Sequence, residues 1–357
     1  MTSATETLRE SEFRAPRVRA RSLVGFAELV AQFGGDTDAL LRGAGIAVEL
    51  LNTPEATLEH AKLLAVLECA AETLGVPDFG LRLARMQGIS VLGPVALIAQ
   101  HAATVGEALA AVGRNIAYHS PGAYLRVGVE PLEGTEGLHA CLRYEAVLPA
   151  GTLHRQNSEL AYAIAVDFLR LISHQPGNDW RVHLHHTIGL GKAEYRRHFG
   201  CEVQLGQAFE ALYFPAEMLN FPVDAADPKM AVMAERFVSH VVRRHPLDIS
   251  MQVETLLIRQ LAGGACTMPV IAKQLTISER SLQRRLLEQG TSFDQIADSV
   301  RRNRAHELLT QTAISSTQIC AALGYTESST LNRSCQRWFN VTPITYRKRH
   351  RRRVRSS

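Results

Sequence analysis

The chain has 357 residues, of which 46% are apolar and 21% charged, a balance that predicts a globular protein long enough for two domains. No apolar run reaches the ~18 residues that a membrane span needs, and the polar N-terminus lacks the apolar stretch of a secretory signal, so we expect a cytoplasmic protein without a membrane partner. The net charge of +4 is concentrated at the C-terminal end, where residues 246–357 hold 17 Lys and Arg against 8 Asp and Glu, which predicts a polyanionic partner for that part.

The first third of the chain is predicted to be helical after a short arm. Residues 1–21 are polar and carry several arginines, and we predict that they form a disordered arm. Across residues 22–122 apolar side chains recur at helical spacing, as at Leu63, Leu67 and Leu74. This stretch therefore predicts amphipathic helices that bury one face.

The pattern changes to strands after residue 122. Two β-leaning runs, 123–129 and 138–147, flank the turn-rich segment 133–137, which predicts a hairpin. Further on we expect a helix and two strands, at 154–172, 182–186 and 211–214. The helical half and these strands together predict one α+β domain over residues 22–222.

The connection to the C-terminal part is expected to be helical. Asp227-Pro228 favours a helix start and His245-Pro246 a helix end, so we assign residues 223–248 to a linker helix between domains. An all-α domain should occupy residues 249–347, followed by a basic tail at 348–357.

One short pattern occurs twice in the last hundred residues. Each copy predicts a short helix, a tight turn and a second helix with a polar outer face, over residues 270–286 and 318–335. Two such units can place two helices in DNA grooves, which favours a DNA-binding regulator over a membrane-surface protein.

The second helix of the first unit has a face suited to reading bases. Leu282 and Leu286 point inward at i and i+4, which leaves Arg280, Gln283 and Arg284 on the outer face. Arg and Gln make bidentate contacts with guanine and adenine edges in the major groove. We therefore predict that these three residues read one half of a DNA site.

The second unit predicts the other half of the reading surface. Between the units a stripe of apolar residues from Phe293 to Leu308 predicts a long connecting helix. In the second unit Ile319, Leu323, Tyr325 and Leu331 face inward. The outer face is predicted to read bases through Ser328, Ser329, Asn332 and Arg333.

Four arginines are candidates for sequence-independent phosphate contacts. These are Arg285, Arg304, Arg337 and Arg347. For Arg285 and Arg337 the sequence leaves ion pairs within the domain as an alternative. We expect the basic tail to add further phosphate contacts.

Residues 271–347 resemble the C-terminal domain of the AraC/XylS family of bacterial transcription regulators. The resemblance rests on five motifs in family order: Ser278-x-Arg280-x-Leu282-x-Arg284-Arg285-Leu286, Gly290-Thr291-Ser292-Phe293, Arg304-Ala305-x-x-Leu308-Leu309, Ile319-x-x-x-Leu323-Gly324-Tyr325 and Phe339-x-x-Thr342-Pro343-x-x-Tyr346-Arg347. It implies two helix-turn-helix units joined by a long helix, with both reading helices in the major groove about one turn, ~34 Å, apart. Where this family usually has phenylalanine, the chain has Leu331 and Cys335, which implies a smaller core.

The N-terminal domain also resembles a known type. Residues 23–222 are similar to the arabinose-binding-type domain of one branch of the same family, through Gly93-Pro94 to Leu109 and Phe199-Gly200 to Pro215. The resemblance implies an effector-binding and dimerisation domain, without establishing arabinose as the ligand. The ligand-binding residues are not indicated by the sequence.

We therefore predict a transcriptional regulator that binds double-stranded promoter DNA as a homodimer, responds to a small molecule and activates transcription with RNA polymerase. The alternative is a nucleoid-like protein that coats DNA without sequence preference, which an all-basic outer face would favour. No nucleophile elbow, phosphate loop or HExxH motif is present, so we expect no enzyme and no cofactor. His183 and His185 share one strand face, but without a Cys or carboxylate pattern we expect no metal site.

Overall fold

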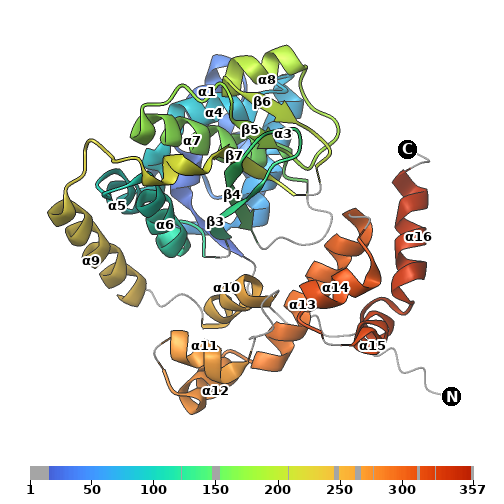
Figure 1. Cartoon of the computed structure of the whole chain (residues 1–357). Helices are drawn as coiled ribbons and strands as arrows, with labels where there is room; N and C mark the ends of the chain where they lie inside the picture. The colour runs from blue at the N-terminus through green and yellow to red at the C-terminus, as the bar shows by residue number, and fades with distance from the viewer. Residues whose placement is uncertain are drawn as a thin grey trace.

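A computed structural model describes residues 16–121, 123–146, 153–207, 209–244, 249–261, 267–275, 277–311, 314–325 and 327–354. An α+β domain and an all-helical C-terminal domain are present, which confirms the predicted fold class (Figure 1). Across these residues none of the helices has both the length and the apolar character needed to span a membrane.

The N-terminal half of the α+β domain is built around helix α3 (His60–Leu74). The inward side chains of α3, among them Leu63, Leu67 and Ala70, are buried against the neighbouring helices. Phe26 and Phe79 meet edge to face here, with ring centroids 5.6 Å apart. The helices that form this core with α3 are α1 (Phe26–Gln32), α2 (Thr37–Gly43) and α4 (Phe79–Gln87).

The prediction of a disordered arm over residues 1–21 is wrong for residues 17–21. Strand β1 (Arg17–Arg19) pairs antiparallel with β2 (Thr57–Glu59), and a 3-10 helix, η1 (Ala20–Leu23), follows it. Val18 is buried in the core of this half, while Arg17 donates to the hydroxyl of Thr57 at 2.8 Å. The alternation of one buried valine between two arginines therefore makes a strand, which the polar composition hid. Residues 1–15 lie outside the described part of the chain.

The second half of the domain is a five-stranded sheet in the order β3-β4-β7-β5-β6. Its strands are β3 (Ala123–Pro131), β4 (Leu138–Ala146), β5 (Arg181–His183), β6 (Glu202–Gln204) and β7 (Ala211–Pro215). Strands β3 and β4 form the predicted hairpin, with Ala123 opposite Ala146 and Pro131 opposite Leu138. All neighbours are antiparallel except β5 and β6. Strand β5 ends at His183, three residues earlier than predicted.

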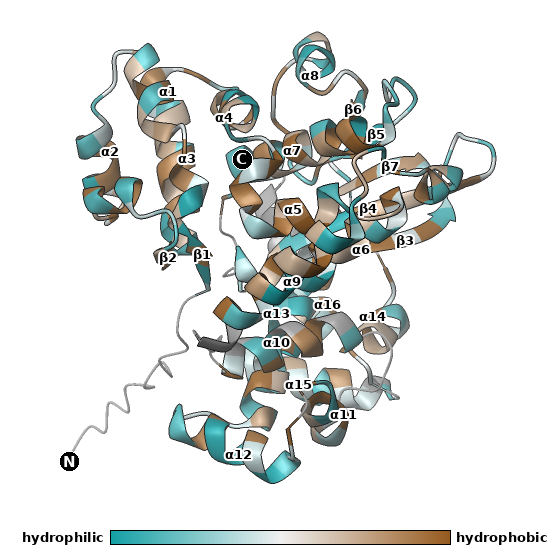
Figure 2. Ribbon diagram, turned by 90° about the vertical axis from the view of Figure 1, so that its left-hand side faces the viewer, coloured by the Kyte–Doolittle hydropathy of each residue, from teal (hydrophilic) through white to brown (hydrophobic). Residues whose placement is uncertain are grey.

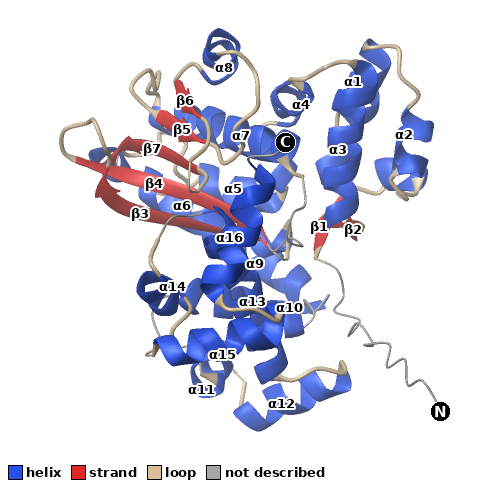
Figure 3. Cartoon of the chain, turned by 90° about the vertical axis from the view of Figure 1, so that its right-hand side faces the viewer, coloured by secondary structure: helices blue, strands red, loops and turns tan. Residues whose placement is uncertain are grey.

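Helices cover one face of this sheet and leave β3 at its edge (Figure 3). Helix α6 (Val105–Asn115) packs on β3, and α7 (Arg155–Ser173) packs on β7 and on α6. Thr104 caps α6 by accepting a hydrogen bond from the backbone N–H of Glu107 at 3.2 Å. Helix α5 (Pro94–Gln100) and α8 (Lys192–Phe199) complete the layer.

The predicted linker helix belongs to the N-terminal domain. Helix α9 (Pro228–Arg244) lies along α5, and its residues Ala234 and Val238 are buried in the same core as α5, α6 and α7 (Figure 1). An apolar face on the helix drives this docking, so residues 228–244 do not span an open gap between domains.

The C-terminal domain holds seven helices among the described residues, and they share one hydrophobic core. Their bounds are α10 (Ile249–Gln260), α11 (Met268–Gln274), α12 (Glu279–Glu288), α13 (Phe293–Gln311), α14 (Ser316–Ala322), α15 (Ser328–Phe339) and α16 (Pro343–Val354). The backbone of α16 continues to Val354, so most of the predicted basic tail extends a helix.

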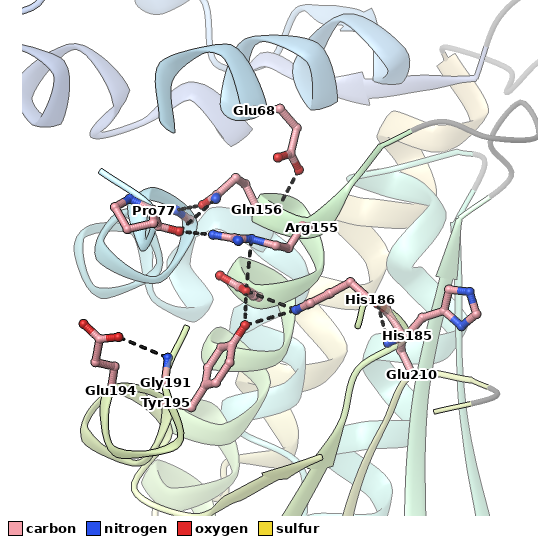
Figure 4. A network of polar contacts seen from close by, with 12 residues as sticks. Glu68, Pro77, Arg155, Gln156, His185, His186, Gly191, Glu194, Tyr195 and Glu210 are labelled. Carbon is pink, nitrogen blue, oxygen red and sulfur yellow. Dashed lines mark hydrogen bonds and ion pairs between the residues drawn. The ribbon is translucent and has the colours of Figure 1, made fainter. Parts of the chain in front are cut away.

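A buried carboxylate ties α7 to the region around α8. The side chain of Glu159 is 0% exposed, and its Oε1 accepts a hydrogen bond from the hydroxyl of Tyr195 at 2.6 Å (Figure 4). Nε2 of His186 and Nε of Arg155 lie 3.2 and 3.4 Å from the same oxygen. A buried charge is tolerated only where it is paired and hydrogen-bonded, so these three partners hold the region together.

We expect the Tyr195→Phe variant to destabilise the N-terminal domain. The phenylalanine fits the same space but removes the donor to a fully buried carboxylate, which should lower the free energy of unfolding by about 1.5–3 kcal/mol. Urea unfolding followed by far-UV circular dichroism measures the change.

Tyr213→Phe is the matched control. Its hydroxyl donates to Glu130 at 2.9 Å, but the Glu130 side chain is 38% exposed, so water can replace the lost bond. Equal losses in the two variants would contradict the role assigned to the Glu159 cluster.

Candidate DNA interface and effector cavity

Helices α11 and α12 form the first predicted helix-turn-helix unit. Ile271, Leu282 and Leu286 are fully buried between them, as the sequence predicts. Ser278 starts α12 by accepting a hydrogen bond from the backbone N–H of Ser281 at 3.2 Å. The apolar side of α12 therefore fixes which of its residues face solvent.

The three predicted base-reading residues of this unit share the exposed face of α12. Arg280, Gln283 and Arg284 follow one another at i, i+3 and i+4, and all are exposed. Arg284 is 70% exposed, and among the described residues it pairs only with Glu288 on the same helix, at 3.6 Å. Helix α12 lies at the lower tip of the molecule and is largely hydrophilic (Figure 2). Its outer side chains are therefore accessible to a long polyanion.

The second unit, α14 and α15, has the same construction. Ser315 and Gln318 make a reciprocal capping box at the start of α14, and Leu331 and Cys335 of α15 are buried. Asn340 ends α15 in the left-handed conformation, with φ of 57°, which asparagine tolerates better than most residues. Leu331 and Cys335 are smaller than phenylalanine, but both are buried in the core of this unit.

The exposed face of α15 carries most of the predicted second reading set. Ser329, Asn332 and Arg333 are exposed, whereas the side chain of Ser328 lies outside the described part of the structure. The hydroxyl of Ser329 donates to the carboxylate of Glu327 at 3.0 Å. A base contact from Ser329 would have to replace that bond.

Helix α13 fixes the second unit through one carboxylate. Asp298 accepts a hydrogen bond from the indole N–H of Trp338 at 2.8 Å and pairs with the guanidinium of Arg337. On the adjacent turn Arg301 donates to the backbone carbonyl of Leu323 at 3.2 Å. These contacts set the position of α15 relative to the connector.

The four predicted phosphate contacts fall into different environments. Arg285 is exposed on α12 and makes no ion pair with a described residue. Arg337 is 63% exposed but already paired with Asp298, so the ion-pair alternative applies to it. Arg347 donates to the carbonyls of Leu309 and Ile314 at 3.4 and 2.7 Å. Its half-buried guanidinium therefore holds α16 to the end of α13, a structural role that the sequence prediction missed.

Arg304 lies within electrostatic reach of Tyr124 in the N-terminal domain. Burial raises the pKa of Tyr124 on β3 well above its ordinary value, the neighbouring Glu145 raises it further, and the Arg304 guanidinium opposes both. Close by, Arg126 of β3 donates to the backbone carbonyl of Ile258 on α10 at 3.4 Å. The edge strand of the sheet therefore contacts the C-terminal domain at α10 and lies close to α13.

A cavity of about 100 Å³ lies inside the N-terminal domain. Its wall comes from both halves: Leu63 and Leu67 of α3 on one side, Leu142 of β4 and Phe168 of α7 on the other. Leu125 of β3 also lines it, next to the residues that contact the C-terminal domain. Sequence reasoning found no ligand residues because these positions are scattered over ten helices and strands.

The polar lining of the cavity is buried and incompletely paired. His60, His119 and Gln87 are each less than a tenth exposed, and each has one polar atom without a hydrogen-bond partner among the described residues. Burial lowers the pKa of His60 to about 4 and that of His119 to about 3, so both imidazoles are neutral at pH 7. Nε2 of His119 lies 3.2 Å from the hydroxyl of Ser22. The sequence signal that could have indicated this polar lining is a histidine within an apolar helical stripe, as at His60.

The histidines between residues 183 and 186 lie in three different environments. The ring of His183 packs at a tilt against Tyr213 with centroids 4.7 Å apart, Nδ1 of His185 lies 2.8 Å from the carbonyl of Gln207, and His186 belongs to the Glu159 cluster (Figure 4). Across the described residues no three or more His, Cys, Asp or Glu side chains gather as metal ligands.

Both domains match known families. Residues 34–223 match the family described as the N-terminal, arabinose-binding domain of AraC transcription regulators. Residues 271–349 match a helix-turn-helix domain family.

Relatives match over nearly the whole chain. The HTH-type transcriptional regulator VirS of Mycobacterium tuberculosis is 35% identical over 331 residues, which cover 92% of this chain and 96% of VirS. The ornithine utilization regulator of Pseudomonas aeruginosa is 25% identical over 338 residues, covering 94% of this chain and 97% of the relative. Among solved structures, the transcriptional regulator CdpR from Pseudomonas aeruginosa aligns with 87% of this chain and 96% of its own, at 20% identity and a TM-score of 0.39.

Proposed function

The chain belongs to the AraC family of transcription regulators, and we propose that it recognises specific promoter sequences as a homodimer under the control of a small molecule bound in the N-terminal cavity. We further propose that it acts in the cytoplasm and activates transcription through RNA polymerase. The observation that carries sequence-specific binding is the composition of the two exposed helix faces.

Those faces are suited to reading bases rather than only to neutralising phosphates. The α12 face combines Arg280, Gln283 and Arg284, and the α15 face combines Asn332 and Arg333 with hydroxyl side chains. Mixed amide, hydroxyl and guanidinium groups discriminate base edges, whereas sequence-independent coating requires only positive charge. The connector α13 supports this role because a fixed spacing of two reading helices matches a fixed spacing of half-sites.

Selection of genomic fragments tests the proposal against the coating alternative. Full-length protein at near-physiological salt should enrich a few sites with two half-motifs about one helical turn apart, ~34 Å. Uniform and salt-labile enrichment would instead assign a coating protein. Run-off transcription with RNA polymerase from an enriched promoter should increase, and a decrease would assign repression.

Arg284 and Arg285 should differ in what their loss does to DNA binding. Arg284→Ala should weaken specific binding by about 1–3 kcal/mol and relax one base position, because a bidentate base contact is lost. Arg285→Ala should weaken specific and random DNA alike and lower the salt dependence by about one phosphate contact. Fluorescence anisotropy with both DNAs over a salt series measures this. If Arg284→Ala weakened both DNAs equally, Arg284 would be a phosphate contact.

The homodimer proposal is supported by an apolar stripe on α9. Met230, Met233 and Phe237 are 41, 65 and 53% exposed, along the side of α9 that adjoins its buried residues Ala234 and Val238. Solvent-exposed apolar residues at i, i+3 and i+7 form a contiguous ridge, which a second copy of the chain would cover.

The Met233→Lys variant tests this dimer surface. A charge in the middle of the stripe should weaken self-association at least ten-fold in sedimentation equilibrium, because a buried lysine would be unpaired. Leu171→Lys, at an exposed position of α7, is the control and should leave association unchanged. An unchanged dimer in Met233→Lys would place the interface elsewhere.

Ligand control is supported by the strand that the cavity and the C-terminal domain share. On β3 the side chain of Leu125 lines the cavity, while Arg126 on the opposite face donates to Ile258 of the C-terminal domain and Tyr124 lies within electrostatic reach of Arg304. We propose that this contact restrains the DNA-binding domain, with Arg304 directed to the protein rather than to phosphate, and that ligand binding shifts the population away from it.

The Arg126→Ala variant should release part of that restraint. Loss of the hydrogen bond to Ile258 should tighten specific DNA binding by up to about five-fold without ligand, the effect of one net hydrogen bond. Arg196→Ala, an exposed arginine on α8, controls for the lost positive charge and should weaken binding slightly or not at all. Weaker binding in Arg126→Ala than in this control would mean that the contact supports the DNA-competent arrangement.

A further inference from the structure

The lining of the N-terminal cavity restricts the kind of ligand it accepts. Most of its residues are aliphatic or aromatic, and no Asp, Glu, Lys or Arg lies among the described residues that line it. The few polar residues include His60, Gln87 and His119, which lie within hydrogen-bond or electrostatic reach of one another or of Ser22. The cavity thus has one polar end and a long apolar wall.

Two common classes of effector do not fit this wall. A sugar would turn most of its hydroxyls toward leucine, valine and isoleucine side chains, where they lose the hydrogen bonds that water provides. A zwitterionic amino acid would bring two charges into a buried space that offers neither an opposite charge nor a charged hydrogen-bond partner. The match to an arabinose-binding family therefore does not make arabinose the ligand of this chain.

The polar end of the cavity is suited to a ligand that donates a hydrogen bond. The amide NH₂ of Gln87 donates to the backbone carbonyls of Ser22 and Val24 at 2.8 and 2.9 Å, which fixes the orientation of the amide. Its Oε1 is buried and accepts nothing from the described residues. A hydroxyl group satisfies such an oxygen, and its own oxygen can accept from a neutral imidazole N–H of His60 or His119.

We propose that the cavity binds a neutral amphiphile, an alcohol or phenol whose single hydroxyl donates to Gln87 and whose apolar body fills the wall formed by α3, α7 and strands β3 and β4. The space of about 100 Å³ is smaller than the ~150 Å³ cavity that holds benzene, so the ligand is small, the size of a short-chain alcohol or of phenol itself. This inference rests on the proposed ligand control, whose site it specifies.

Calorimetric titration of the full-length protein with 1-pentanol tests the proposal. The comparison ligands are butyl methyl ether, an isomer of 1-pentanol that lacks a donor, pentanoate at pH 8, L-arabinose and L-leucine. We expect saturable binding of 1-pentanol, at least five-fold weaker binding of the ether, and none of the other three. Saturable binding of arabinose, leucine or pentanoate that excludes 1-pentanol would overturn the proposal.

Two variants separate the cavity from adventitious surface binding. Ala165→Phe, on the wall from α7, should fill the space and abolish 1-pentanol binding, and Ala161→Phe replaces it if the first variant does not fold. Leu171→Phe, exposed on the same helix, is the matched control and should bind 1-pentanol like the wild type. Binding of 1-pentanol that survives both filling substitutions would overturn the site.

Gln87→Met tests the polar end. The substitution keeps the length of the side chain but removes the acceptor, so the preference for 1-pentanol over its ether isomer should disappear. A merely structural role for Gln87 would weaken both ligands equally and keep the preference, which would overturn the assigned hydrogen bond. Genomic selection with the same preparations reports on DNA recognition separately, so a failure of the ligand class and a failure of the proposed regulator are distinguishable.

Discussion

The packing of α7 on α4 is the constraint on which the N-terminal domain depends. The two helices approach so closely at Gly80 that a side chain there would meet the backbone carbonyl of Gln156. The backbone N–H of Gly80 donates to the side chain of Gln156 at 2.7 Å, and the backbone N–H of Gln156 donates to Glu68 on α3 at 2.8 Å (Figure 4). This contact joins the helical half to the sheet half, and the cavity lies along the same seam.

Helix α7 therefore packs on α4, carries a buried carboxylate and forms part of the cavity wall. Its N-terminal turns carry the buried Glu159 and one of its partners, Arg155, and its middle turns supply Ala161, Ala165 and Phe168 to the cavity. A ligand that fills the cavity presses on α7 and on strands β3 and β4 together. The helices of this domain cover one face of the sheet (Figure 3). The opposite face of the edge strand β3 can therefore contact the C-terminal domain, as Arg126 does.

The C-terminal domain was largely predictable because its signals are local. Helical periodicity located the connector from Phe293, and the inward positions Leu282, Leu286, Leu331 and Cys335 are buried as expected. The hairpin of β3 and β4 followed from alternation and a glycine-rich turn. Errors occurred where a segment is set by distant partners: the arm pairs with residues 57–59, and α9 docks on α5 instead of bridging the domains.

The sequence by itself determined the regulator family, the two helix-turn-helix units and the faces of α12 and α15 that are exposed, because each depends on residues three or four positions apart. Only the tertiary structure decided which arginines are available to DNA, since Arg337 and Arg347 are engaged by partners more than thirty residues away. It also decided the cavity, where His60, Gln87 and His119 converge from separate elements with unpaired polar atoms. Such convergence leaves no periodic pattern in the sequence, because it arises from the packing of whole helices and strands on one another.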